Sequence, residues 1–368
     1  MKKPVLAILL VLSVISLSSR AAESVLDKSL NEEVVFIKNG SGIFSTELET
    51  TFFKPVGNGP FPLVVINHGK ESGNPRFQPR ARYIVAAREF VKRDYVVMIP
   101  MRGGFSRSSG SYIAGGCNIE GNSSPQAKDV RAALDYAVTL PYVDKQKILV
   151  MGQSHGGLTT MAFGTQPYPG VRGLVNFAGG LRLSDCGAWE RSLIKAFESF
   201  GEKNRFPTLW FYGDNDSYWP KGTIAEMHSH YVGAGGTARM VAYGTFKGDS
   251  HGMFGHRDGL VIWWPEVEKF LVDLGLPTQI LPATAETDPV ITRLQEAGNA
   301  LALSDHCKEI YRTFLDADYP RAFAVSDKTC GYANGGEDPK KRAMDFCRGK
   351  KEISCKLFVV DDSVVGEL

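Results

Sequence analysis

The chain has 368 residues, of which 43% are hydrophobic and 22% charged, and its formal net charge is +2. The length suits one large α/β domain with a small appendage or two medium domains, and the composition excludes a disordered or collagen-like chain. The first 21 residues hold three basic and no acidic side chains, so the rest of the chain carries about −1. Because a domain that neutralises phosphates would keep a positive excess, we expect no nucleic-acid partner.

The N-terminal residues have the pattern of a secretory signal peptide. Two lysines precede an apolar run over residues 4–17, and small residues then lead to Ala21 and Ala22, after either of which cleavage is expected. The run is short for a membrane span, which needs about 20 apolar residues. We therefore expect residues 1–21 to be removed, no membrane span to remain, and the protein to be periplasmic or secreted.

From Glu33 to Pro282, short apolar runs alternate with segments of helical periodicity. In residues 129–137, apolar side chains recur at positions i, i+3, i+4 and i+7, as on one face of a helix. This alternation predicts an α/β domain with a mostly parallel sheet and helices on both faces, whose functional loops follow the carboxyl ends of the strands. The predicted strands cover residues 34–37, 63–67, 96–100, 148–152, 171–177, 209–213 and 240–243. The predicted helices cover residues 83–93, 127–139, 156–163, 190–200, 224–232 and 266–274.

The composition changes after the last of these helices. We expect the α/β domain to span residues 22–282 and a linker rich in alanine and threonine to span residues 283–289. A small cysteine-rich α+β domain should then occupy residues 290–368, opening with a helix over residues 290–302.

Six cysteines remain after removal of the signal peptide, and four of them lie in the small domain. An even number of cysteines in an exported protein favours disulfides, which a small domain needs for stability. No Cys-x-x-Cys pair occurs, so neither a zinc ribbon nor a redox-active motif is expected. Among the connectivities that six cysteines allow, we expect Cys117–Cys186, Cys307–Cys330 and Cys347–Cys355.

Two segments match the Gly-x-Ser-x-Gly pattern of a nucleophile elbow, around Ser154 and Ser250. An elbow needs a strand that enters a sharp turn and a helix that leaves it. The predicted strand at 148–152 and helix at 156–163 supply both around Ser154, whereas no good helix follows Ser250. A helix amino terminus also directs backbone donors at developing negative charge. We therefore predict Ser154 as the nucleophile; the alternative is a serine that only caps the helix.

A serine nucleophile requires a histidine base and a carboxylate that orients it, in the chain order Ser, Asp or Glu, His. His251 lies in a glycine-flanked loop after a predicted strand and is the candidate base, with His256 as the alternative. Asp216 follows another predicted strand and is the candidate acid, with Asp214 as the alternative. Asp249, beside the candidate base, fits a local hydrogen-bonding role better. The other downstream histidines fit the role of base less well: His155, His228, His230 and His306.

An oxyanion hole requires two backbone donors. We expect one to be the N–H of His155, directly after the nucleophile. The other should be the N–H of Lys70, with Gly69 as the alternative, in the loop after the predicted strand at 63–67. His68, in the same loop, fits a structural role. Three aromatic residues near the catalytic loops are candidates either for a substrate pocket or for core packing: Tyr218, Trp219 and Phe254.

In this order along the chain, these features resemble an α/β-hydrolase of the dienelactone hydrolase-like, secreted carboxylesterase type. The resemblance covers about 250 residues and extends beyond the elbow. It implies nucleophile, acid and base roles for Ser154, Asp216 and His251. Dienelactone hydrolases proper use a cysteine nucleophile, so the serine here favours ordinary ester hydrolysis. The motifs that carry it are Asn67-His-Gly69, the helix before Val143-Asp144, Ser154 in its elbow, Gly213-x-x-Asp216-x-x-x-Pro220 and the late His251.

The last domain resembles, less specifically, a small module found on exported bacterial proteins. This resemblance implies export and leaves the partner of the domain unknown. The likeness lies in Cys330-Gly-Tyr-Ala, Arg342-Ala-Met, Cys347 and Cys355-Lys-Leu.

Together these residues predict a serine carboxylesterase that cleaves a small-molecule or glycan-linked ester through an acyl-enzyme, with no metal and no cofactor. The same triad is also able to cleave peptides, as the exported relatives of prolyl and dipeptidyl peptidases do. A third possibility is a silent hydrolase fold that acts as a binding protein through its cysteine-rich tail. The intact set of triad residues argues against a silent fold.

Overall fold

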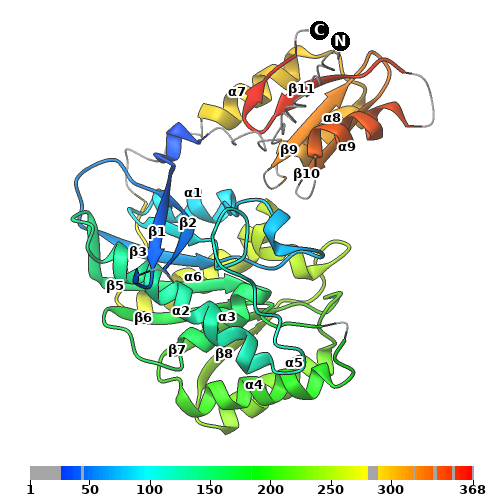
Figure 1. Ribbon diagram of the computed structural model, residues 1–368. Helices are drawn as coiled ribbons and strands as arrows, with labels where there is room; N and C mark the ends of the chain where they lie inside the picture. The colour runs from blue at the N-terminus through cyan, green and yellow to red at the C-terminus, as the bar shows by residue number, and fades with distance from the viewer. Residues whose placement is uncertain are drawn as a thin grey trace, which may run out of the picture.

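The computed structural model describes residues 26–42, 45–183, 185–280, 289–315, 317, 320–334, 338–349 and 353–366. The predicted signal peptide (1–21) lies outside these residues, as does the predicted linker (283–289) apart from its last residue. Among the residues described, no helix is both long and apolar enough to cross a membrane. The chain forms a large domain (residues 26–280) and a small domain (residues 289–366). In Figure 1 the small domain is at the top and the large domain is below it.

An eight-stranded sheet forms the centre of the large domain (Figure 1). Its strand order is β1-β2-β4-β3-β5-β6-β7-β8. β2 runs antiparallel to both of its neighbours, and the neighbouring strands from β4 to β8 run parallel. This confirms the mostly parallel sheet predicted from the sequence. The strands are β1 (Glu33–Asn39), β2 (Thr46–Phe53), β3 (Phe61–Asn67), β4 (Val96–Pro100), β5 (Val143–Gln153), β6 (Val171–Phe177), β7 (Pro207–Tyr212) and β8 (Thr237–Ala242).

Helices cover both faces of this sheet and form two hydrophobic cores. One core joins α2, α3, α4 and α5 to strand residues such as Leu63 and Val65. The other joins α1 and α6 to the alternate residues Val64 and Ile66. Because successive side chains of a strand point to opposite faces, a continuous apolar strand serves both cores. The helices are α1 (Ile84–Val91), α2 (Ile119–Ala137), α3 (His155–Phe163), α4 (Trp189–Lys203), α5 (Lys221–Gly233) and α6 (Leu260–Asp273).

Strand β2 differs from the sequence prediction, which has no strand at 46–53. It contains two glutamates and three threonines, so its alternation of polar and apolar residues is weak. Three of these polar residues, Glu49, Thr50 and Thr51, are nevertheless buried. Distant side chains supply partners for them: Arg80 donates to the Thr51 hydroxyl at 2.7 Å. Helices α2 and α6 also begin earlier than predicted, since each continues through an internal proline, Pro125 or Pro265. Proline normally indicates a boundary in a sequence pattern.

The small domain packs helices against a four-stranded antiparallel sheet of order β10-β9-β11-β12. One of its hydrophobic clusters includes the Cys307–Cys330 disulfide, and the other includes the Cys347–Cys355 disulfide. The predicted small α+β domain with disulfides is therefore confirmed. Its elements are α7 (Pro289–Ala300), α8 (Asp305–Leu315), β9 (Arg321–Val325), β10 (Cys330–Asn334), α9 (Pro339–Arg348), β11 (Lys356–Val360) and β12 (Ser363–Val364).

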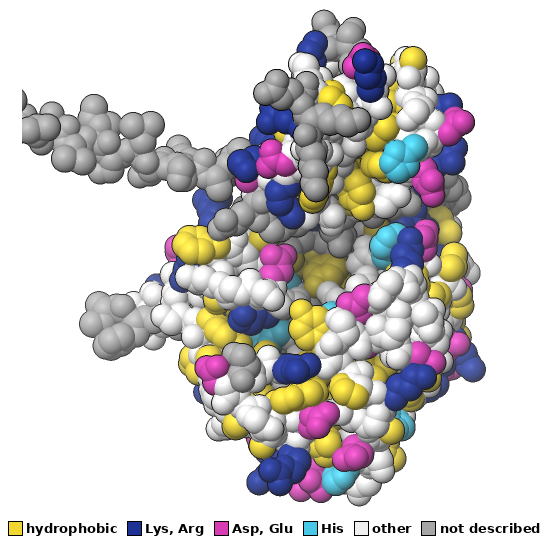
Figure 2. All heavy atoms as spheres, turned by 90° about the vertical axis from the view of Figure 1, so that its right-hand side faces the viewer, with side chains coloured by type: hydrophobic (Ala, Val, Ile, Leu, Met, Phe, Trp, Pro, Cys, Tyr) yellow, Lys and Arg dark blue, Asp and Glu magenta, His cyan; other side chains and the backbone are white. Residues whose placement is uncertain are grey.

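The two domains face each other across charged side chains, and the space-filling view has a hollow between them (Figure 2). Burial raises the pKa of Asp361 in the small domain, and the positive charge of Arg82 in the large domain opposes that rise. Burial also raises the pKa of Glu71, which follows the predicted oxyanion residue Lys70. The positive charge of Arg342 in α9 opposes that rise. The small domain therefore lies near the loop that follows β3.

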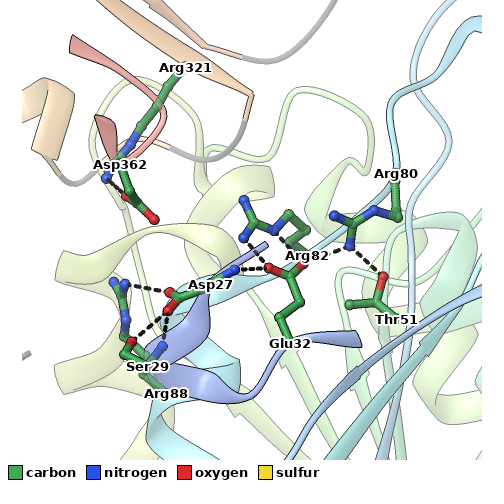
Figure 3. Close-up of polar contacts among 9 residues, drawn as sticks. All are labelled: Asp27, Ser29, Glu32, Thr51, Arg80, Arg82, Arg88, Arg321 and Asp362. Atoms are coloured by element: carbon green, nitrogen blue, oxygen red, sulfur yellow. Dashed lines mark hydrogen bonds and ion pairs between the residues drawn. The ribbon is translucent and has the colours of Figure 1, made fainter. Parts of the chain in front are cut away.

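Buried ion pairs hold the first described residues of the large domain in place (Figure 3). The side chain of Glu32 is fully buried and accepts hydrogen bonds from Arg80 Nη1 at 2.7 Å and from Arg82 Nε at 2.8 Å. Asp27 pairs with Arg88 at 3.1 Å. Because removing one partner of a buried pair leaves an uncompensated charge, these contacts fix the chain ahead of β1.

Candidate active site

Ser154 occupies a sharp turn between β5 and α3, at the carboxyl edge of the sheet. Its backbone has φ 57° and ψ −123°, a conformation that is costly for a residue other than glycine. The turn depends on its glycine neighbours. A Cβ atom on Gly156 would lie 1.9 Å from the Asn67 carbonyl oxygen, and one on Gly152 would lie 2.3 Å from that of Gly156. This is the geometry of a nucleophile elbow.

The second Gly-x-Ser-x-Gly segment has no such turn. Ser250 begins the short 3-10 helix η4 (Ser250–Gly255), and its side chain is completely buried. Gly248 and Gly252 have open space where a Cβ atom would be, so no close backbone approach requires glycine there. The match around Ser250 is therefore a coincidence of sequence and not an elbow.

Asp216 and His251 meet beyond the carboxyl ends of β7 and β8. The Nδ1 atom of His251 lies 3.1 Å and 3.0 Å from the two carboxylate oxygens of Asp216. The carboxylate is fully buried and also accepts backbone N–H bonds from Tyr218 at 2.8 Å and Trp219 at 3.1 Å. These bonds hold the carboxylate against Nδ1 and leave Nε2 as the ring nitrogen available for another partner.

The histidine loop contacts the elbow through the residue before Ser154. The Nε2 atom of Gln153 donates a hydrogen bond to the His251 carbonyl at 2.8 Å, and Tyr83 donates to Gln153 Oε1 at 3.1 Å. The hydroxyl of Ser154 has no hydrogen-bond partner among the described residues, so its bond to the imidazole is not formed in this structure. Catalytic bonds of this kind are often long without substrate and tighten when it binds.

The alternative acid and base lie elsewhere in these loops. Asp214 forms an ion pair with Lys221 at 2.9 Å, on the first turn of α5. His256 packs beside Phe246 and caps the short 3-10 helix η5 (Arg257–Gly259). Asp214 therefore pairs with a lysine, and His256 Nδ1 lies 3.9 Å from the exposed carboxylate of its near neighbour Asp258. Asp216 instead brings a fully buried carboxylate to within 3.0 Å of His251 Nδ1, as a triad requires.

Asp249 connects the acid loop to the histidine loop, as its predicted hydrogen-bonding role implies. It accepts bonds from the Ser217 N–H at 3.1 Å, the Ser217 hydroxyl at 2.6 Å and the His251 N–H at 2.9 Å. Burial alone would raise the pKa of Asp249, but these hydrogen bonds hold it below its ordinary value. The ionised carboxylate therefore keeps the two loops in register.

The two residues expected to form the oxyanion hole lie on neighbouring parts of the sheet edge. His155 is the first residue of α3, where a backbone N–H has no acceptor within the helix. The Gly69 N–H is already used, since it donates to the Tyr83 hydroxyl at 3.1 Å. Within the described part of the chain, the Lys70 N–H has no such acceptor, which favours Lys70 over Gly69.

The three aromatic candidates for a substrate pocket separate into two groups. Trp219 is 2% exposed and Phe254 is 1% exposed, so both belong to the core. Phe254 stacks on Phe177 with a centroid distance of 4.1 Å, and Trp219 donates from Nε1 to the Ala178 carbonyl at 2.7 Å. For these two, the low exposure favours core packing, the alternative expected from the sequence. Tyr218 alone of the three is exposed, and its ring lies 4.4 Å from that of His251.

A disulfide joins two loops at the carboxyl edge of the sheet. Cys117 lies between β4 and α2, Cys186 lies between β6 and α4, and the two form the predicted pair. Since β3 and β5 lie between β4 and β6, this disulfide bridges loops on either side of the elbow. Together with the two pairs of the small domain it accounts for all six cysteines.

The strand order, the antiparallel β2 and the elbow after β5 give the chain the fold of the α/β-hydrolase superfamily. Among protein-family models, that of the prolyl oligopeptidase family matches residues 82–169. The match includes Ser154 and ends before Asp216 and His251. No curated protein matches the chain.

The chain is similar to solved structures at low sequence identity. A putative dipeptidyl aminopeptidase IV from Bacteroides ovatus is 18% identical with a TM-score of 0.50, covering 65% of this chain and 35% of its own. DcsB, solved in complex with its substrate analogue, is 13% identical with a TM-score of 0.50, covering 66% of this chain and 99% of its own. A putative dienelactone hydrolase from Klebsiella pneumoniae is 15% identical with a TM-score of 0.45, covering 66% and 99%.

Proposed function

We propose that the protein is a serine hydrolase that cleaves carboxylic esters through an acyl-enzyme intermediate. The observation that carries the proposal is the buried Asp216 carboxylate on Nδ1 of His251, 3.0 Å away, at the sheet edge that also holds the Ser154 elbow. A serine hydroxyl is a poor nucleophile without a base, and a histidine oriented by a carboxylate is the base this fold provides.

The reaction follows from the positions of these groups. Ser154 Oγ attacks the acyl carbon of the ester while Nε2 of His251 takes its proton, and Asp216 stabilises the imidazolium. The N–H groups of His155 and Lys70 bind the oxyanion of the tetrahedral intermediate. The intermediate expels the alcohol, which takes its proton from His251. Water then attacks the acyl-serine, gives a proton to His251, and releases the acid and the free serine.

The substrate is a small-molecule or glycan-linked ester. Three disulfides suit an oxidising compartment, so the reaction would take place in the periplasm or outside the cell. The exposed ring of Tyr218 beside His251 provides one apolar wall for the substrate.

A serine peptidase is the second candidate, and the match to the prolyl oligopeptidase family over residues 82–169 favours it. The same triad serves both reactions, which differ in the leaving group. A panel of nitrophenyl esters and aminoacyl-nitroanilides separates them: the proposal expects turnover of esters and little or none of anilides. A preference for the anilides would show that the protein is a peptidase and not an esterase.

Replacing each of the two motif serines tests the nucleophile. The Ser154→Ala variant should lose ester turnover, and Ser250→Ala, its matched control from the second Gly-x-Ser-x-Gly segment, should retain it. A folded Ser154→Ala protein with activity near that of the unmodified protein would overturn the proposal. A folded protein that hydrolyses no member of the panel would indicate a silent hydrolase fold that binds without catalysis.

A further inference from the structure

We propose that two buried side chains, His68 and Arg102, position both backbone donors of the oxyanion hole. They are therefore positioning residues for the reaction proposed above, on which this inference rests. Neither side chain is exposed to solvent: His68 is 1% exposed and Arg102 is fully buried. Both act through hydrogen bonds to the backbone and side chains of the donor segments.

His68 fixes the peptide plane that carries the Lys70 N–H. Its Nδ1 atom lies 2.7 Å from the Gly69 carbonyl oxygen and must carry the proton, since a carbonyl can only accept. The Gly69 carbonyl and the Lys70 N–H belong to one planar peptide unit, so holding the oxygen also directs the N–H. Gln78 Nε2 donates to the same carbonyl at 3.1 Å. A carbonyl that accepts hydrogen bonds also polarises the N–H of its own peptide.

Arg102 joins His68 to the elbow. Its backbone N–H donates to Nε2 of His68 at 3.2 Å, which leaves Nδ1 as the protonated nitrogen. Its guanidinium Nη2 lies 2.7 Å from the His68 carbonyl and 3.0 Å from Nδ1 of His155. One nitrogen therefore holds a residue from each donor segment: the loop after β3 and the first turn of α3. The planar guanidinium allows this double contact, and an ammonium group would not reproduce its geometry.

The bonds of His155 complete the arrangement. Nδ1 of its ring accepts from Arg102, and Nε2 donates to the Asn122 side-chain oxygen at 2.8 Å. The ring is therefore neutral and turned inward, which leaves its backbone N–H at the start of α3 for the oxyanion. Burial, together with the charge of Arg102, holds the pKa of both His68 and His155 well below the ordinary value.

Burying the charged side chain of Arg102 costs free energy of desolvation, which argues for a role beyond packing. Within the described part of the chain, no carboxylate lies within ion-pair distance of its guanidinium, and Nη1 has no hydrogen-bond partner. Burial lowers its pKa to about 10, so it stays protonated at neutral pH. A buried cation without a contacting anion destabilises a fold, and such a cost is characteristic of functional sites.

Matched substitutions of His68 test the inference in the intact protein. His68→Leu removes the hydrogen bond to the Gly69 carbonyl, whereas His68→Asn keeps an N–H donor near the position of Nδ1. We expect kcat of the leucine variant on the best nitrophenyl ester to fall about 10- to 100-fold with KM changed less than about threefold. The asparagine variant should recover at least about tenfold of that loss.

Substitutions of Arg102 test the second of the two positioning residues. Arg102→Gln should lower kcat to a similar degree, and combining it with His68→Leu should add little, because both act on the same donors. Arg93→Gln is the control: Arg93 is also buried, donating to Glu89 and to the Thr278 carbonyl, but makes no contact with the donor segments. It should leave kcat unchanged. If the leucine variant does not fold, Arg102→Lys should still lower kcat about tenfold.

The outcomes distinguish this inference from the proposed function. An active unmodified protein whose folded His68→Leu or Arg102→Lys variant keeps its kcat overturns the positioning role and leaves the esterase intact. Equal losses in the asparagine and leucine variants of His68 overturn it as well, since only a bulk packing role would treat them alike. An unmodified protein without turnover overturns the proposed function, and the positioning role with it.

Discussion

Acid should destabilise the large domain through two histidines that are buried in their neutral form. Burial and the charge of Arg102 hold the pKa of His68 and His155 well below 6.5 in the folded state. Below that pH the unfolded chain binds protons that the folded chain does not. The contribution of these two histidines to the free energy of unfolding is therefore constant well above pH 6.5 and falls as pH drops below it.

The size of the effect follows from the number of histidines. Each one contributes up to about 1.4 kcal/mol per pH unit, so the pair should lower the free energy of unfolding by about 2.7 kcal/mol between pH 7.5 and pH 5.5. The raised pKa of the partly buried Asp129 acts in the opposite direction, since protonating that carboxylate stabilises the fold. Comparison with histidine variants separates the contribution of the histidines to the free energy of unfolding from that of Asp129.

Urea unfolding followed by tryptophan fluorescence measures the effect. All five tryptophans lie in the large domain, so the signal does not report the small domain. His155→Gln should reduce the pH dependence by about half, since one of the two histidines is removed. His230→Gln, at an exposed position of α5, should leave it unchanged. A transition midpoint that is the same at pH 7.5 and pH 5.5, or an unaltered pH dependence in His155→Gln, would refute the reasoning.

Three further predictions concern the loops around the site. Asp216→Asn should lower kcat/KM for esters about 10,000-fold with the fold retained, because the imidazole loses the partner that sets its tautomer; a loss below tenfold would argue against the triad. Asp249→Ala should lower kcat/KM about tenfold, because the acid and histidine loops lose three hydrogen bonds; unchanged steady-state kinetics would exclude that role. Replacing Cys117 and Cys186 by serine should reduce the free energy of unfolding by up to about 4 kcal/mol, given a separation of 69 residues; urea unfolding tests this, and an unchanged midpoint would contradict it.

The sequence predicts those parts of the site that depend on local structure. The elbow around Ser154 follows from a strand, two glycines and a helix that adjoin in the sequence. Asp216 and His251 each follow a strand of a parallel sheet, and the carboxyl ends of such strands share one edge. The order of the elements is predicted for similar reasons. The three disulfides confirm the expected cysteine pairs, but no local pattern selects those pairs among the connectivities that six cysteines allow.

The sequence pattern does not predict features that depend on contacts between distant segments. Strand β2 is stabilised by pairing with β1 and β4 despite its polar residues. Trp219 and Phe254 adjoin the catalytic loops in sequence, but the direction of a side chain depends on what the fold packs against it. Arg102 reaches His68 and His155 from a third strand end. Its one local signal is that it is a basic residue two positions after a strand that the pattern predicts to be buried.

Labelling with a fluorophosphonate, followed by peptide mapping, tests the central claim most directly, because only an activated serine reacts with the probe. We predict one adduct, on Ser154, and a strongly reduced labelling rate in Asp216→Asn. An adduct on Ser250, or a folded protein that the probe does not label at all, would contradict it.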